Sequence, residues 1–357
     1  MKLKRELVQE IRQFIIDSVP DHPSDLVATV AAKFDLSRQA ALNNVKRLVD
    51  ENVIDQSGTK RGCTYALKAH MVDLRVQLTD GLDESEVWQT LVRTFLPKLR
   101  PNVAFICSYG FTEVLGNAMS HSEGDTVEVR VEYDECEIRM SLTDNGIGIF
   151  TKICHSLQVN NPVDAVIEIH KGKFTTDPDR RLGEGLFYVS RLFDEFSIRS
   201  AGYDFKLAGS KESLTEYPLD PSNHGTEISM KIALDSTLEA DDVFSGHNAK
   251  GELGEGESAF GLSKTRISVG LMQHGGVALV SRAQGKRLVD RLEKFKEIIL
   301  DFEGVQKIGQ GFADELFRLF PNAHPDVHMH LVNQSESIEK MVRHVRAVGS
   351  DGFIWRH

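Results

Sequence analysis

A stretch with almost no large apolar side chain, SGHNAKGELGEGES at 245–258, interrupts the hydrophobic patterning of this chain. Glycine and charged residues dominate it, so it has little to bury in a core. We therefore predict a linker at 235–262. The 357 residues also exceed one ordinary domain, at about 150 residues each. We expect folded domains at 1–70, 72–234 and 263–357.

The composition is that of a soluble globular protein, with 41% hydrophobic and 27% charged residues. Its four cysteines form no CxxC pair, which favours reduced thiols over a disulfide framework or a zinc site. They are Cys63, Cys107, Cys136 and Cys154. The first residues, MKLKRELVQE, lack an apolar signal segment, and no run of about 18 apolar residues occurs. We expect a cytoplasmic protein without membrane contact.

Residues 1–70 are predicted to form three helices and a small hairpin. Apolar residues recur at helical spacing, and the Ser37 hydroxyl can cap a helix by accepting a backbone N–H. The helices are expected at 3–18, 25–34 and 37–51, and the segments VIDQSG and CTYALKA are expected to pair as strands. This pattern looks like a winged helix-turn-helix.

The polar side of the third helix is a candidate DNA-binding surface, because such a helix can enter the major groove. The candidate residues are Arg38, Gln39, Asn43, Asn44, Lys46 and Arg47, with Lys60 and Arg61 at the tip of the wing. Residues 1–75 hold 12 Lys and Arg against 10 Asp and Glu, in a chain of net charge −11. Any nucleic-acid contact is therefore expected at this end. So weak a positive charge leaves protein binding as the alternative.

The central region mixes helical and strand-like patterns. Helices are expected at 84–99, at 104–121 and from about residue 185, and strands at 126–133, 137–143, 196–201, 203–208 and 227–232. Helices on one side of a mostly antiparallel sheet make a layered α+β fold.

A first motif in this region is Glu113-Val-Leu-Gly-Asn117. Residues four apart share one face of a helix, so the carboxylate and the amide oxygen lie close together. Magnesium prefers such oxygen ligands, completed by waters and phosphates. The spacing alone is more often a solvated helix face.

A second motif, Asp144-Asn-Gly146-Ile-Gly148, follows directly after the strand-like segment IRMSLT. An aspartate at a strand end can accept a hydrogen bond from the adenine amine, and glycines let the backbone approach a ring without a Cβ clash. A plain Asn-Gly β-turn is the alternative.

A third motif, Arg181-Leu-Gly183-Glu-Gly185-Leu186, opens a predicted helix. Glycines at a helix start expose N–H groups, and the helix dipole favours phosphate oxygens there. Glycine spacing alone is a weak signal, so the prediction of a nucleotide site depends on all three motifs together.

Together the motifs resemble the nucleotide-binding boxes of the gyrase, heat-shock-90, histidine-kinase and MutL ATPase family, over about residues 85–233. The phrase EVLGNAMSHS looks closer to its anti-sigma serine-kinase branch. The resemblance implies a Bergerat-type α/β sandwich that binds ATP and Mg2+, with a lid at about 150–182. By this resemblance, Glu113 orients or activates water, Asn117 binds magnesium and Asp144 binds adenine. Gly146 and Gly148 shape the base pocket, and Gly183 and Gly185 contact the phosphates. Further nucleotide-binding residues are Arg181, Leu186 and Thr226. No histidine stands in a phospho-acceptor context, which argues against a self-phosphorylating sensor kinase.

Residues 263–357 alternate between strand-like and helical patterns, as in a small α/β domain. Strands are expected at 267–271, 277–279, 298–301 and 328–332, and helices at 281–295, 312–320 and 337–348. The segment IILDFEGVQKIGQGFADELFRLF resembles a STAS-like domain of the kind found in anti-sigma antagonists. Those antagonists carry a phosphorylatable hydroxyl at the helix start, whereas IGQGF at 308–312 has none. The resemblance implies a protein partner or self-assembly.

Three functions are compatible with this organisation. The first is a DNA-binding transcriptional regulator whose state is set by ATP binding or slow hydrolysis. The second is an anti-sigma-type serine/threonine kinase that acts on a separate partner. The third is a non-enzymatic scaffold on DNA, against which the intact motif set argues. Winged helices often act as dimers, so a homodimer is also considered.

Overall fold

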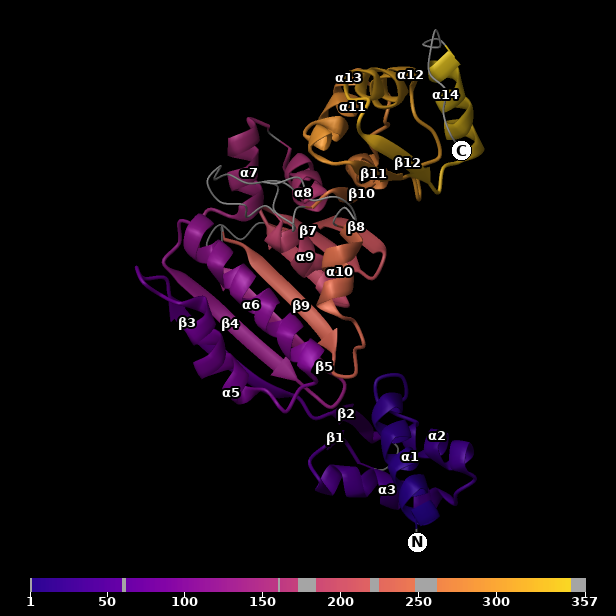
Figure 1. Cartoon of the computed structure of the whole chain (residues 1–357). Helices are drawn as coiled ribbons and strands as arrows, with labels where there is room; N and C mark the ends of the chain where they lie inside the picture. The colour runs from indigo at the N-terminus through magenta and orange to yellow at the C-terminus, as the bar shows by residue number, and fades with distance from the viewer. Residues whose placement is uncertain are drawn as a thin grey trace.

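The computed structural model describes residues 2–59, 62–159, 161–172, 184–218, 225–247 and 262–347. Figure 1 shows the central domain between an N-terminal helical domain and a C-terminal α/β domain. The fold is therefore multidomain α+β, as the sequence predicts.

The N-terminal domain contains the predicted three helices and hairpin. These are α1 (Lys2–Ser18), α2 (Leu26–Phe34), α3 (Arg38–Asp50), β1 (Ile54–Ser57) and β2 (Thr64–Leu67), with β1 and β2 antiparallel. Helix α3 begins after Ser37, whose hydroxyl accepts the Ala40 N–H at 3.2 Å. Ile15, Val30 and Val45, one from each helix, are fully buried and belong to a hydrophobic core of the N-terminal domain.

A seven-stranded antiparallel sheet organises the central domain. Its order is β3 (His70–Gln77), β4 (Thr126–Tyr133), β5 (Glu137–Asp144), β9 (Glu227–Ala233), β6 (Glu195–Ser200), β7 (Tyr203–Ala208) and β8 (Lys211–Glu216). Alternation along the strands places apolar residues on one face. One buried row crosses five strands through Val129, Leu142, Ile228, Ile198 and Phe205.

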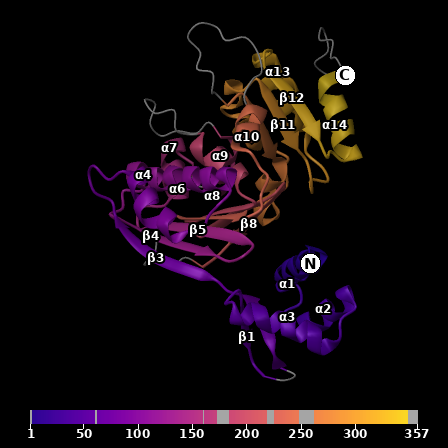
Figure 2. The same cartoon turned by 60° about the horizontal axis from the view of Figure 1, so that its bottom comes forward.

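Helices cover that apolar face, as Figure 2 shows for α4 and α6 above β4 and β5. The helices are α4 (Glu84–Val87), the π-helix η2 (Trp88–Val92), α5 (Arg93–Phe95), α6 (Pro101–His121), α7 (Ile149–Leu157), α8 (Pro162–Lys171), α9 (Gly185–Leu192) and α10 (Ala240–His247). Phe111 of α6 is fully buried and packs on Trp88, with ring centroids 5.6 Å apart. The layered arrangement predicted for this region is present.

The C-terminal domain has a parallel sheet in the order β10 (Lys264–Ser268), β11 (Glu297–Asp301) and β12 (His328–Val332). Parallel strands need crossover connections, and helices supply them here. The connecting helices are η3 (Val269–Gly276), α11 (Arg282–Val289), η4 (Leu292–Lys294), α12 (Gln310–Asp314), η5 (Glu315–Leu319) and α13 (Phe320–Ala323), and α14 (Glu336–Ala347) follows β12. Helix α11 begins with a capping box between Ser281 and Gln284.

Several elements differ from the sequence expectations. Residues 277–279, expected as a strand, belong to no sheet, because η3 turns the chain away directly after β10. The edge strands β3 and β8 were not expected, since only Leu214 is a large apolar residue in β8. Helix α10 lies within the stretch 235–262 and packs on α6 and α9.

The central and C-terminal domains share one continuous cluster of buried apolar residues, from Val76 to Val345. The N-terminal core instead touches the central domain through Cys136, at the turn between β4 and β5. All four cysteines are free thiols. Within the described residues, no helix combines the length and apolar character needed to cross a membrane.

Candidate nucleotide site

Asp144 ends strand β5 beside β9 and is only 8% exposed. Its Oδ1 accepts the N–H groups of Gly146 at 2.9 Å and of Thr226 at 3.2 Å. Its own N–H donates to the Thr226 carbonyl at 3.0 Å. Two segments that are 82 residues apart in sequence therefore hold this carboxylate in one orientation.

Two glycines allow the backbone to close around Asp144. A Cβ on Gly225 would lie 1.8 Å from the Asp144 carbonyl oxygen, and a Cβ on Gly146 would lie 2.0 Å from the Ser122 carbonyl oxygen. Ser122 caps α6, and its carbonyl also accepts the Ile147 N–H at 2.9 Å. The end of α6 thus packs directly on the turn after Asp144.

Glu113, in the middle of α6, lies against the start of α9. A Cβ on Gly185 would lie 2.0 Å from Glu113 Oε2. Asn117 follows one turn later on α6 and is half-buried. From Glu113 to Ser122 the helix axis covers about 14 Å at 1.5 Å per residue. One helix therefore connects residues of all three sequence motifs.

Burial sets the electrostatics of both acidic residues. It raises the pKa of Glu113, and the nearby Glu84 carboxylate raises it further. Burial also raises the pKa of Asp144, although the N–H groups of Gly146 and Thr226 oppose the shift by stabilising the anion. Poorly solvated carboxylates with raised pKa values are typical of functional sites.

Two acidic residues near Glu113 were missed at the sequence level. Glu84, at the start of α4, carries no motif that would reveal it. Glu184, the residue before α9, stands between two glycines of the third motif, where its sequence position does not reveal its contacts. Its Oε1 accepts the Leu262 N–H at 3.1 Å, which connects the start of α9 to the C-terminal domain.

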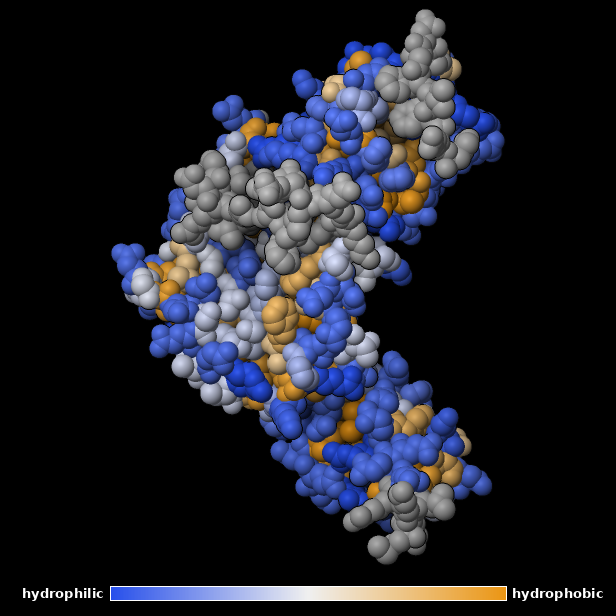
Figure 3. All heavy atoms as spheres, viewed as in Figure 1, coloured by the Kyte–Doolittle hydropathy of each residue, from blue (hydrophilic) through white to orange (hydrophobic). Residues whose placement is uncertain are grey.

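Helix α10 packs on two tyrosines of this region. The Phe244 ring lies 5.5 Å from that of Tyr109 and 5.0 Å from that of Tyr188. Burial raises the pKa of Tyr109, and Glu113 raises it further. Figure 3 shows apolar side chains gathered over α6, α9 and α10 between hydrophilic flanks. Phe105, half exposed, stacks on Tyr109 in this area.

The other predicted nucleotide-site residues have different placements. Gly148 has a positive φ of 84° and precedes α7, whose first residue, Ile149, donates its N–H to Thr226 Oγ1 at 2.8 Å. Leu186 is a core residue with 7% exposure. Arg181 and Gly183 lie outside the described residues. Of the predicted lid, α7 and α8 are regular helices packed against each other.

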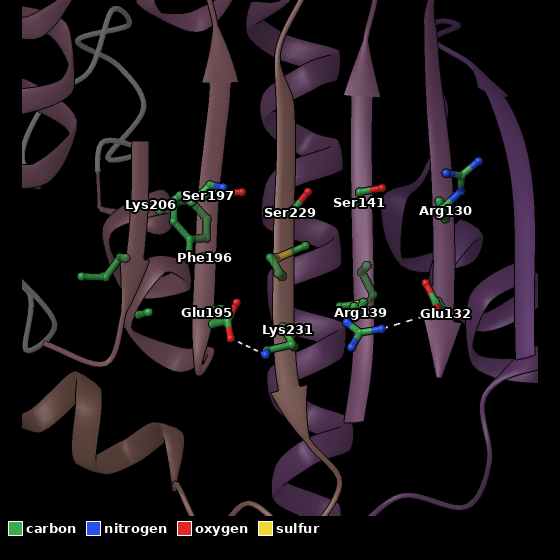
Figure 4. Close-up of a pocket in the computed structure, with 14 residues that line it drawn as sticks. Arg130, Glu132, Arg139, Ser141, Glu195, Phe196, Ser197, Lys206, Ser229 and Lys231 are labelled. Carbon is green, nitrogen blue, oxygen red and sulfur yellow. Dashed lines mark hydrogen bonds and ion pairs between the residues drawn. The ribbon is translucent and has the colours of Figure 1, made fainter. Parts of the chain in front are cut away.

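A separate hollow of about 490 Å3 lies on the open face of the sheet. Figure 4 shows its polar side chains in front of the strands, with α6 behind them. Ser141, Ser229 and Ser197 form a row across β5, β9 and β6, and Arg130 and Lys206 flank this row. Asp144 and Glu113 do not line this hollow, so it is distinct from the candidate nucleotide site.

The candidate DNA-binding residues on α3 point mostly to solvent. Arg38, Gln39, Asn43, Lys46 and Arg47 are exposed, and Asn44 is half-buried. Asn44 donates to the Ala40 carbonyl at 2.9 Å, and Arg47 pairs with Glu51 at 2.8 Å, so both already have partners within the helix. Lys60 and Arg61 lie outside the described residues.

The residues present suit ATP with magnesium. The oriented Asp144 carboxylate is an acceptor of the kind that the adenine amine requires. No group of three or more His, Cys, Asp and Glu residues that could hold a metal occurs in the described part of the chain. Magnesium needs none when phosphates and waters supply most of its ligands, with one side chain such as Asn117.

Comparison with known families agrees with this geometry. Residues 110–236 match the family model of the histidine kinase-, DNA gyrase B-, and HSP90-like ATPase. Residues 284–339 match the STAS-like domain of unknown function (DUF4325). A search of curated proteins returned no match. The chain thus contains a histidine kinase-, DNA gyrase B- and HSP90-like ATPase domain, which implies ATP binding, followed by a STAS-like domain.

Proposed function

We propose that this chain is an ATP-responsive regulator that binds DNA through its N-terminal domain. The observation that carries the nucleotide part is the carboxylate of Asp144, held by N–H groups of Gly146 and Thr226 at the end of helix α6. An acceptor fixed in this way is ready for the adenine amine without further reorganisation. Asn117 would hold magnesium, and Glu113 would orient or activate water.

The DNA-binding part rests on α3. Its exposed side carries Arg38, Gln39 and Lys46, which are residue types that contact base edges and phosphates. The Ser37 cap supports the helix from its first turn. The N-terminal core meets the central domain at Cys136, which directly precedes β5 and lies about 26 Å from Asp144 at roughly 3.3 Å per residue. The bound nucleotide would therefore affect DNA binding indirectly, by changing how the N-terminal and central domains are arranged.

A second candidate is a serine/threonine kinase that acts in trans. Its support is the raised pKa of Glu113, which suits a base for an acceptor hydroxyl. The start of α12 reads Gly309-Gln310-Gly311 and offers no hydroxyl, so the acceptor would belong to a separate protein.

Labelled ATP with magnesium separates these functions. Free labelled phosphate indicates hydrolysis, labelled protein partner indicates a kinase, and saturable binding without turnover indicates a sensor. The decisive variant is Asp144→Asn, which keeps an oxygen for the two N–H groups but turns an amide donor toward the adenine amine. It should weaken ATP binding about 10- to 100-fold, the effect of one hydrogen bond to a charged group.

The same variant should lose less affinity for a 6-oxopurine nucleotide, whose carbonyl accepts where adenine donates. Equal ATP affinity in the wild type and in Asp144→Asn would refute the proposed adenine contact. Absence of ATP binding by the wild type would instead favour the scaffold.

A further inference from the structure

Helix α8 is buried between two domains. It packs on α7 and α9 of the central domain and on β10 and η3 of the STAS-like domain, and Figure 1 shows it at this position. Eight of its ten residues are buried, including the charged Glu168 and Lys171. An exposed lid helix would have a solvated face, whereas this helix has domains on both sides.

Lys171, the last residue of α8, is only 1% exposed. Its ammonium donates to Glu168 of its own helix, to the Arg287 carbonyl at 3.2 Å and to the Asp290 carbonyl at 2.9 Å. Those carbonyls belong to the C-terminal end of α11, where backbone oxygens lack intrahelical partners and the helix dipole is negative. A lysine of one domain thus caps a helix of the other.

Other contacts extend the interface between α8 and the STAS-like domain, which we call the seam. Thr265 of β10 is fully buried and donates its hydroxyl to the Lys171 carbonyl at 2.9 Å. The exposed Arg287 side chain pairs with the partly buried Asp164 at 3.7 Å. A cavity of about 60 Å3, partly lined by Glu168 and Asp290, remains between the domains. The charged groups around this small cavity distinguish it from the apolar cluster that the two domains share elsewhere, and such a polar part of an interface can rearrange more readily than the apolar part.

The seam is directly connected to Glu113. Gly172 follows Lys171 with a φ of 97°, and a Cβ there would lie 2.4 Å from Phe187 and 2.7 Å from Leu262. Leu262 in turn donates to Glu184, which immediately precedes Gly185. Because Gly185 lies against Glu113, a shift of the STAS-like domain relative to α8 would move the start of α9.

We propose that the seam is a regulatory contact in which Lys171 is a positioning residue: docking of the STAS-like domain on α8 and occupation of the nucleotide site alter each other. This inference rests on the proposed nucleotide function. Coupling of this kind requires a difference in affinity between docked and undocked states. It is also reciprocal, so ATP must change the stability of the seam by the factor by which docking changes ATP affinity.

The test compares full-length variants for ATP affinity and for hydrogen exchange at 282–290, with and without ATP and magnesium. Lys171→Met combined with Glu168→Gln removes both buried charges, so that no orphaned carboxylate unfolds the protein. In the wild type, ATP should change exchange at 282–290. In the double variant this response should disappear, and ATP affinity should change at least about fivefold, the lower end of typical couplings.

Two further variants separate the seam from general stability. Thr265→Val keeps the side-chain shape and should shift ATP affinity in the same direction by a smaller factor. Arg287→Ala removes only the 3.7 Å ion pair that the exposed Arg287 side chain forms with Asp164 and leaves the Arg287 carbonyl in place, so its ATP affinity should stay within about twofold of wild type.

Wild-type ATP affinity in the double variant, or unchanged exchange on ATP binding in the wild type, would overturn the coupling alone. A wild type that binds no ATP would overturn the proposed function and the coupling with it.

Discussion

The carboxylate of Glu113 lies so close to the backbone of Gly185 that a Cβ at residue 185 would come within 2.0 Å of Oε2. Glu113 belongs to α6, whereas Gly185 begins α9, 72 positions later in the sequence. This contact places the Glu113 carboxylate beside the first residue of α9. The free N–H groups at the start of such a helix are suited to bind phosphate.

Gly185→Ala should therefore disturb nucleotide binding and turnover, because the new methyl group must displace Glu113 or the start of α9. Turnover and ATP affinity of purified full-length protein measure the effect. Gly116→Ala, on the helix α6 that carries Glu113, is the control, since the nearest atom to its Cβ would be Glu84 Oε1 at 3.9 Å. The control should keep activity and gain up to about 1 kcal/mol of stability from helix propensity. Equal activity in both variants would contradict the prediction.

Glu113→Gln should change how stability depends on pH. Burial raises the Glu113 pKa above its ordinary 4.5, so the folded protein holds this proton more tightly than the unfolded chain. As pH rises from 4.5 through the raised pKa, ionisation favours the unfolded state, and the free energy of unfolding falls. The glutamine cannot ionise, so this part of the fall should vanish.

Urea denaturation of both proteins between about pH 4 and pH 7 measures the difference. Glu84→Gln is the control: it removes the neighbouring charge but leaves the burial, so it should reduce the fall without abolishing it. Parallel stability curves for wild type and Glu113→Gln would show that Glu113 has no raised pKa.

Lys46→Glu should weaken DNA binding for any DNA sequence, because Lys46 is exposed on the polar side of α3. Each lost phosphate contact should also lower the slope of log affinity against log salt by about one. Titration of labelled duplex DNA at several salt concentrations measures both effects. Lys33→Glu, an equal charge reversal on α2, controls for net charge. If Lys33→Glu weakens binding as much, the α3 surface is not the DNA contact.

Ser37→Ala should lower the stability of the N-terminal domain by about 1 kcal/mol, the usual contribution of an N-cap hydrogen bond. The Ser37 hydroxyl accepts the Ala40 N–H at 3.2 Å and supports the first turn of α3. Chemical denaturation followed by a probe in this domain measures the loss. Ser37→Thr keeps the hydroxyl and should recover most of the stability. No loss in the alanine variant would mean that the cap contributes little.

Local patterns in the sequence determined most of the elements and the identity of the candidate site. The alternation in 126–133 and 137–143, the Ser37 cap and the three motifs could be recognised because each depends on neighbours within a few residues. Weakly apolar segments could not be recognised in this way: β8 pairs as an edge strand through its backbone, and its side chains carry almost no signal. The prediction of a strand at 277–279 was wrong for the opposite reason: these residues have an apolar pattern but do not pair with another strand.

Only the tertiary structure decided how the motifs and domains meet. The approach of Gly185 to Glu113, and the burial of Lys171 between α8 and α11, join residues distant in sequence. The sequence around Lys171 does not indicate its burial, because a charged side chain gives no sign of its partners. Its carbonyl partners belong to the backbone of another domain, and backbone acceptors are the same at every position of a sequence. The seam therefore depends on packing between residues that are far apart in the sequence, and local sequence patterns do not encode such packing.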